Sequence, residues 1–212
     1  MPATFFLCSG VVGTNRQFWF ETDMSESERQ SLKSIPDDKR LDILRELGFS
    51  ETTGLATRQA LSVAEIKEMK DAVDFQSHTI YHPILPQCSA ARALREISES
   101  RNELQDKFGL PIYALAYPNG SYSDREIEMA KAAGYKCALT MDFGFNSNKT
   151  QVFQLKRICI NDDASIDELI VTASGLWGFL KNLMRSSSRR KELFRGDMGV
   201  PARRSSSKEG LL

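Results

Sequence analysis

The two histidines of this chain lie four residues apart, in the stretch at residues 77–83 that reads SHTIYHP. A short, largely apolar run, Val73 to Phe75, comes directly before it. If that run is a strand, both imidazoles lie on the turn at its C-terminal end, where this spacing lets the two rings face one point. Neutral imidazole is a common ligand of divalent transition metals. The pattern therefore predicts His78 and His82 as metal ligands.

The spacing alone is equally compatible with two separate polar residues on the surface, but the neighbouring residues favour a metal site. Ser77 and Thr79 carry hydroxyls that can hydrogen-bond a ring nitrogen and fix its tautomer, and Pro83 stiffens the exit from the turn. A catalytic zinc site usually has three protein ligands and one open position. We therefore expect Zn²⁺, with Co²⁺ or Ni²⁺ as alternatives, and one further ligand.

Strands and helices are expected to alternate along the chain. Apolar, β-rich runs predict strands at residues 3–8, 73–75, 112–117, 136–141 and 155–160. Helical periodicity, Ser-x-x-Glu capping boxes and glycine stops predict helices at residues 37–47, 62–72, 89–108, 123–134 and 165–180. This order predicts an α/β fold with a parallel sheet, and leaves a barrel and an open sheet both possible. The first strand has almost no polar alternation, so we expect it to be buried on both faces.

Residues 14–36 are polar and are predicted to form an irregular loop over the mouth of the sheet. Trp19 and Phe20 are its aromatic anchor, and they either stack on a sugar ring or pack the loop onto the body of the protein. Parallel β/α domains place their sites at the C-terminal ends of the strands. Besides the histidines, those ends carry residues 117–120, Asp142 and Arg157, and one pocket could collect them all. For Asp142, capping a turn is the favoured role.

The composition indicates one globular domain with a short appendage. The chain has 212 residues, of which 41% are hydrophobic, enough for one sizeable core. Lys and Arg (28) balance Asp and Glu (28), which gives no reason to expect nucleic acid or an acidic membrane as a partner. From residue 181 onward nine basic residues face three acidic ones, which leaves 19 basic and 25 acidic residues in the first 180. We expect a domain over residues 1–184 and a basic, Ser- and Arg-rich disordered tail over residues 185–212.

The four cysteines, Cys8, Cys88, Cys137 and Cys159, form no C-x-x-C pair, so buried reduced thiols are favoured over disulfides or metal ligands. No apolar stretch reaches the ~20 residues of a membrane span, and the start of the chain has no signal-peptide pattern. This absence by itself favours the cytoplasm, but it decides nothing if the chain is truncated, so the location is left open.

The histidine stretch is one of a larger set of motifs. Residues 61–69 (LSVAEIKEM) come before it and residues 116–123 (AYPNGSYS) after it. The opening residues 2–7 (PATFFL), then 133–135 (AGY) and 155–158 (LKRI), complete the set. In this order the motifs resemble polysaccharide deacetylases of carbohydrate esterase family 4, the NodB-homology type, from residue 2 to about residue 160.

The resemblance implies a distorted (β/α) barrel and a metal-dependent hydrolase that removes acetyl groups from N- or O-acetylated polysaccharide or oligosaccharide. The residues that it assigns are His78 and His82 as metal ligands, the backbone N–H of Asn119 as oxyanion donor, and Tyr117, Pro118 and Arg157 as substrate contacts.

The chain departs from the family pattern at several positions. The family's first strand ends in an Asp-Asp motif that supplies the catalytic base and a carboxylate ligand, and it has no counterpart here because Met1 stands just before Pro2. Ala116 replaces an arginine that orients the base, and Asn119 replaces a tyrosine. Arg157 stands where some relatives carry a histidine acid, and since arginine keeps its proton near neutral pH, ion pairing or substrate orientation is left to it.

We therefore expect either an N-terminally truncated deacetylase, inactive or weakly active in this form, or a degenerate homologue that binds glycan without catalysis. A third interpretation is an unrelated sugar- or nucleotide-binding β/α protein in which the histidines are structural.

Overall fold

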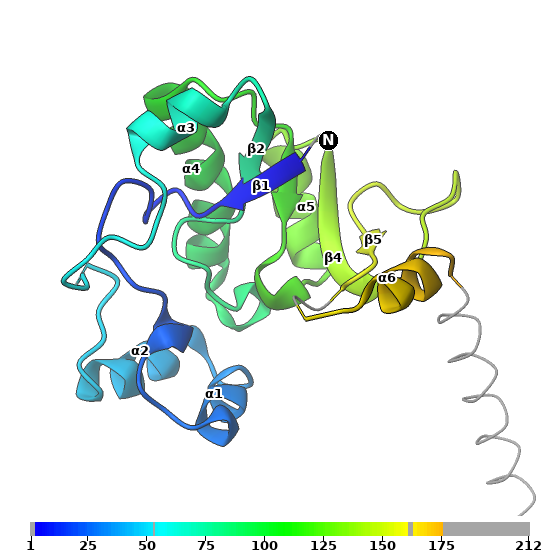
Figure 1. Cartoon of the computed structure of the whole chain (residues 1–212). Helices are drawn as coiled ribbons and strands as arrows, with labels where there is room; N and C mark the ends of the chain where they lie inside the picture. The colour runs from blue at the N-terminus through cyan, green and yellow to red at the C-terminus, as the bar shows by residue number, and fades with distance from the viewer. Residues whose placement is uncertain (1–2, 53, 161–162, 176–212) are drawn as a thin grey trace, which may run out of the picture. The chain divides into compact units, whose positions relative to one another are not determined.

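A computed structural model describes residues 3–52, 54–160 and 163–175 of the chain. The chain divides into two compact units, Met1–Cys159 and Ile160–Leu212. The first unit contains the sheet, as Figure 1 shows. In the second unit the described residues include one helix, α6 (Ile166–Ala173), which Ser165 begins by accepting the N–H of Glu168. The predicted tail, residues 185–212, and the end of the helix predicted at residues 165–180 lie outside the described residues.

The first unit is organised around a five-stranded parallel sheet. Its strands are β1 (Ala3–Leu7), β2 (Val73–Ser77), β3 (Ala114–Ala116), β4 (Cys137–Phe143) and β5 (Leu155–Arg157). Each strand pairs with the next one in the chain, in the order β1-β2-β3-β4-β5, and every pair is parallel. The predicted α/β class with a parallel sheet is confirmed. This strictly sequential order is the one that strands have in a (β/α) barrel.

The predicted burial of the first strand on both faces is wrong. In the described sheet β1 pairs only with β2, so it is an edge strand, and its first three residues are exposed. The side chain of Phe5 is 47% exposed. An unbroken apolar run is therefore not enough to tell a central strand from an edge strand, because the partner on the open side is not encoded in the run itself.

Four of the helices of the first unit begin and end close to their predicted positions. They are α2 (Asp37–Glu46), α3 (Val63–Met69), α4 (Ala90–Phe108) and α5 (Asp124–Ala132). The N-caps explain this accuracy: Ser62 and Ser123 form capping boxes with the glutamates three residues later. Helix α4 ends at Gly109, whose φ of +65° suits a residue without a Cβ.

The region predicted as an irregular loop contains a fifth helix, α1 (Glu26–Leu32). Ser25 accepts the backbone N–H of Glu28, and the Glu28 carboxylate accepts the N–H of Ser25. The prediction was wrong here because a seven-residue helix has too little periodicity to be recognised among so many polar residues.

Two apolar cores stabilise this unit. The larger one lies between the sheet and the helices and includes Leu104 and Leu115, both fully buried. Burying a leucine side chain contributes about 1.5–3 kcal/mol. The second core gathers Trp19, Leu32, Leu44, Phe49 and Ile84. It packs α1 and α2 beside the loop that follows β2, and this packing brings residues of α1 to the site described below.

All four cysteines are free thiols, as predicted. Cys8 and Cys88 are buried and Cys137 is half-buried, whereas Cys159 is exposed, so the expected burial is wrong for Cys159. None of the described helices is both long and apolar enough to cross a lipid bilayer.

Candidate functional site

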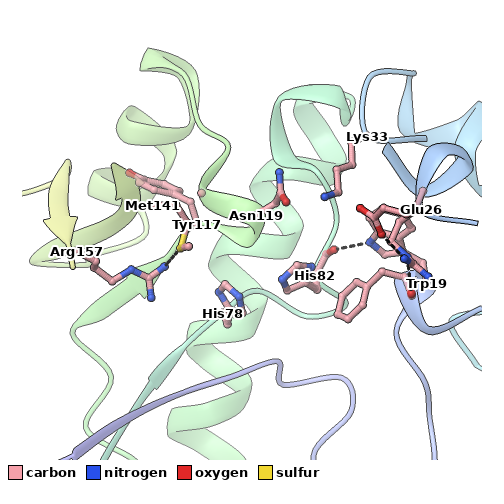
Figure 2. Close-up of a pocket in the computed structure, with 12 residues that line it drawn as sticks. Trp19, Glu26, Lys33, His78, His82, Tyr117, Asn119, Met141 and Arg157 are labelled. Carbon is pink, nitrogen blue, oxygen red and sulfur yellow. Dashed lines mark hydrogen bonds and ion pairs between the residues drawn. The ribbon is translucent and has the colours of Figure 1, made fainter. Parts of the chain in front are cut away.

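A pocket of about 470 Å³ opens at the C-terminal ends of the strands. It is lined by Trp19, Phe20, Glu26, Arg29, Lys33, His78, His82, Tyr117, Asn119, Gly120, Met141 and Arg157. Figure 2 shows the two histidines between Arg157 on one side and Trp19, Glu26 and Lys33 on the other. Of the predicted site residues, both histidines, Tyr117, Asn119 and Arg157 are in this lining.

His78 follows the last residue of β2, and its ring is held by the neighbouring strand. Its Nδ1 lies 2.7 Å from the carbonyl oxygen of Ala116, at the end of β3. A carbonyl can only accept, so Nδ1 carries the proton and donates, which leaves the lone pair of the neutral ring on Nε2. Burial lowers the pKa of His78 to about 4. The imidazole is therefore neutral at pH 7, the form that binds a metal.

His82 lies against His78, with ring centroids 4.7 Å apart and the planes at 77°. Burial, and to a smaller extent the nearby His78, lowers the pKa of His82 to about 3. Its Nδ1 is buried and has no hydrogen-bond partner among the described residues. The rings of Phe18 and Phe20 lie 5.8 and 5.0 Å from the His82 ring. Since a buried polar atom without a partner costs about 1–3 kcal/mol, a cation that binds this nitrogen would remove a penalty.

The loops that carry the site have an unusual backbone. Thr79, His82 and Asn119 have φ values of 70°, 59° and 55°, and no other non-glycine residue of the described chain has a positive φ. Each such residue costs of order 1–3 kcal/mol and persists only where its surroundings hold it. Here the Thr79 hydroxyl accepts the His82 N–H at 3.1 Å, and the Thr79 carbonyl accepts from the Ser9 N–H and the Ser100 hydroxyl.

Glu96, on the buried face of α4, is the strongest support of this loop. One carboxylate oxygen, Oε2, accepts the backbone N–H groups of Ile80 at 2.9 Å and Tyr81 at 3.0 Å. The other oxygen lies 3.3 Å from a guanidinium nitrogen of Arg92. Burial raises the pKa of Glu96 to about 7. The two N–H groups lie between the two histidines in sequence, so Glu96 fixes the geometry of the pair. Sequence analysis missed this residue, because nothing in a helical pattern indicates what a glutamate on it will contact.

The second loop, after β3, brings the predicted oxyanion donor to the pocket. Tyr117 is fully buried, and its hydroxyl donates to the carbonyl of Phe153 at 3.2 Å. Asn119 is exposed, and within the described part of the chain its backbone N–H donates no hydrogen bond. Gly120 has φ +67°, and a Cβ built on it would lie 2.5 Å from the Cβ of Met141. Pro118 is buried and does not line the pocket.

Arg157, in β5, is anchored at the pocket wall. Its Nε donates to the carbonyl of Thr140 at 2.8 Å, and a terminal nitrogen lies 2.9 Å from Sδ of Met141. Asp142 does not line the pocket: it lies inside β4, exposed, and accepts the Tyr122 hydroxyl at 3.1 Å. The expectation that Asp142 caps a turn is wrong. The side chains of a strand point alternately to its two faces, so Asp142 faces away from the side that Met141 occupies.

The histidine pair fits two ligand positions of a metal centre. Both rings are neutral, they are adjacent, and each has a nitrogen that makes no hydrogen bond with a described residue. Among residues 3–52, 54–160 and 163–175, no group of three His, Cys, Asp or Glu side chains is arranged to hold a metal ion. The third protein ligand of a catalytic zinc site is therefore not among these residues.

Comparisons with known proteins bear on the family and the fold of the chain. The family model described as polysaccharide deacetylase matches residues 1–138. The Streptococcus pyogenes deacetylase PplD, solved in complex with acetate, is 31% identical over 55% of this chain and 52% of PplD, with a TM-score of 0.52. IcaB from Ammonifex degensii is 18% identical over 82% of this chain and 61% of its own, with a TM-score of 0.53, and shows likeness of fold alone.

A Bacillus subtilis (strain 168) protein, YxkH, named as a proposed polysaccharide deacetylase, is 22% identical over 129 residues, which are 58% of this chain and 46% of YxkH. The chain thus spans about half the length of PplD and of YxkH.

Proposed function

The chain belongs to the polysaccharide deacetylase family, and from this premise we propose that it removes acetyl groups from N- or O-acetylated polysaccharide with a divalent metal, Zn²⁺ above all, at His78 and His82. The observation that carries the proposal is the pair of neutral imidazoles in one pocket, with the Nδ1–H of His78 fixed by Ala116 and a buried ring nitrogen of His82 left without a partner. PplD, solved with acetate, supports acetate as the product.

The residues of this chain would divide the work as follows. A bound divalent cation supplies Lewis acidity toward water and toward the acetyl carbonyl. His78 would hold the cation through Nε2, because its Nδ1 is engaged with Ala116. The N–H of Asn119, at the start of a short turn, would donate to the oxygen on which negative charge develops. Tyr117 and Pro118 would shape that turn, and Arg157 would orient the sugar.

The second candidate function is a glycan-binding module that keeps the fold without the chemistry. The specific observation in its favour is that the described residues supply two metal ligands rather than three. General-base catalysis alone contributes about 10²- to 10⁴-fold, and loss of a ligand weakens metal binding. For the chain as given, we therefore propose weak turnover or none.

One experiment separates the two. The purified chain is equilibrated with Zn²⁺ or Co²⁺, bound metal is measured by elemental analysis, and acetate release is followed from acetylated chito-oligosaccharide and from acetylxylan. The matched control is the His78→Asn/His82→Asn variant. Metal bound by the wild type and lost in the variant supports the metal site, whereas equal metal in both refutes it. Fast acetate release would show that a base is present that we have not identified.

A further inference from the structure

The pocket contains more positive charge than the reaction on a neutral sugar requires. Its ionised lining residues are three cations, Arg29, Lys33 and Arg157, and one carboxylate, Glu26, while both histidines are neutral. The first 180 residues, in contrast, carry 19 basic and 25 acidic side chains. The net positive charge of the pocket lining is therefore opposite in sign to the net charge of the first 180 residues.

Two of these cations form no ion pair with a described residue. Glu26 is satisfied by Arg29 and by the Gln30 amide, so that carboxylate and Arg29 neutralise each other. Lys33 is half-buried and directly follows α1; its backbone N–H donates to Gln30, and its charge helps to lower the pKa of the Glu26 carboxyl, but its ammonium makes no ion pair or hydrogen bond with any described residue. Arg157 contacts a carbonyl and a thioether, both uncharged. A lysine that loses part of its hydration without an ion pair is unfavourable unless a ligand supplies the partner.

The arrangement also indicates how the missing charges are spaced. Figure 2 shows Lys33 and Arg157 on opposite sides of the histidine pair, with the ammonium of Lys33 turned toward the pocket. Two carboxylates on the sugars that flank an acetylated sugar could each meet one of these cations, with the acetylated sugar over the histidines. A divalent metal at His78 and His82 would add positive charge and strengthen this preference.

We propose that the substrate is an acidic acetylated polysaccharide, one whose sugars carry carboxylates, and that Lys33 and Arg157 are the residues that select it. This inference rests on the proposed function, because it places an acetyl group at the histidines. Lys33 directly follows α1, which the second core packs beside the loop after β2, and this packing brings the charge of Lys33 to the site.

The test is a binding comparison between two tetrasaccharides that both contain N-acetylglucosamine. Hyaluronan tetrasaccharide carries carboxylates and chitotetraose carries none. Binding to the Zn²⁺-equilibrated full chain is measured by calorimetry at 50 and 300 mM NaCl. We expect the carboxylated sugar to bind about 3- to 10-fold more tightly at low salt, and the ratio to shrink at high salt because the contacts are partly exposed.

Variants assign the preference to residues. Lys33→Gln should lower the affinity ratio to below about twofold, and Lys33→Arg should retain it because the charge is kept. Lys39→Gln, on the exposed face of α2 and outside the pocket, should leave the ratio unchanged. Melting temperatures of all variants check the fold, since a lysine at the end of α1 also interacts with the helix dipole. A Lys33→Gln variant that melts earlier but keeps the ratio would show that Lys33 only caps its helix.

The two proposals fail in different ways. If the chain binds Zn²⁺ and both tetrasaccharides with equal affinity, the charge preference is wrong and the deacetylase proposal stands. If it binds neither sugar and no metal, both proposals are refuted.

Discussion

Glu96 gives the sharpest prediction about the site, because a single oxygen of its carboxylate holds the loop between the two histidines. Glu96→Ala removes the acceptor of two N–H groups, those of Ile80 and Tyr81, in a position where Glu96 itself is only 3% exposed. Each buried donor left without a partner costs about 1–3 kcal/mol, so we expect a loss of about 2–5 kcal/mol in the free energy of unfolding. At about 2–4 °C per kcal/mol for a chain of this size, the melting temperature should fall by roughly 4–20 °C.

The matched control is Glu99→Ala, three residues along the same helix, where an exposed carboxylate pairs with Arg95. It should cost no more than about 1 kcal/mol. Glu96→Gln should recover much of the loss, since an amide oxygen can occupy the position of the one carboxylate oxygen that accepts both N–H groups.

Metal affinity separates positioning from stability, and it is measured by Co²⁺ titration at a temperature where all three variants are folded. Changing a residue that holds metal ligands in place costs about 10- to 100-fold in metal affinity, and we expect Glu96→Ala to fall in this range. If Glu96→Ala melts early but binds Co²⁺ as well as Glu99→Ala does, Glu96 stabilises the protein without positioning the histidines, and the reasoning is wrong.

Three further predictions concern the same pocket. Gly120→Ala should lower the free energy of unfolding by about 2–4 kcal/mol, and Gly109→Ala by about 1 kcal/mol, in denaturant unfolding. Both glycines have nearly the same positive φ, but only at Gly120 would a Cβ collide with Met141. Equal losses would mean that the collision is relieved. In the metal-free protein, the lowered pKa values of His78 and His82 make the folded state less stable as the pH falls: the stability present above the unfolded pKa of about 6.5 is lost as the pH approaches 4. Urea titrations at pH 7 and pH 5 should show a loss of roughly 2 kcal/mol for each histidine, relative to the double asparagine variant. A difference between the two proteins that stays constant with pH would contradict the burial of the rings. Added Zn²⁺ should raise the melting temperature of the wild type and not that of either single variant, His78→Asn or His82→Asn, since each removes one of the two ligands that the described chain offers; a rise in both variants would place the metal elsewhere.

The elements that could be predicted are those whose signals are local. Ser62 and Ser123 each precede a glutamate by three residues, and the glycine after α4 ends it, so the helix boundaries were readable from the sequence. Ser25 and Glu28 form the same kind of capping box before α1, but the polar residues that follow give no helical periodicity to support a helix prediction there. The exposure of β1 could not be read in this way, since it depends on which strands flank it.

The residues of the site also differ in whether local sequence or long-range packing places them. The spacing of His78 and His82 on one turn after a strand is local, and the structure does bring the two rings together. Lys33 reaches the pocket only because a second core packs α1 against the loop after β2, and that packing involves residues from positions 19 to 84. For Asp142 the sequence predicts a turn cap, because the residue lies near the end of a predicted strand, but β4 continues past it and it accepts the hydroxyl of Tyr122 instead.

The left-handed backbone at Thr79 and His82 shows why motif spacing alone is not enough to make this site. Two such residues cost of order 1–3 kcal/mol each, so an isolated SHTIYHP segment would relax to other conformations in which the imidazoles diverge. What prevents this comes from far along the chain, from Ser9 in the loop after β1 and from Glu96 and Ser100 on α4. A homologue that keeps both histidines but has lost an acceptor at the position of Glu96 should therefore retain the motif and lose the metal. This makes the residue at position 96 a better indicator of a working site than the histidine spacing itself.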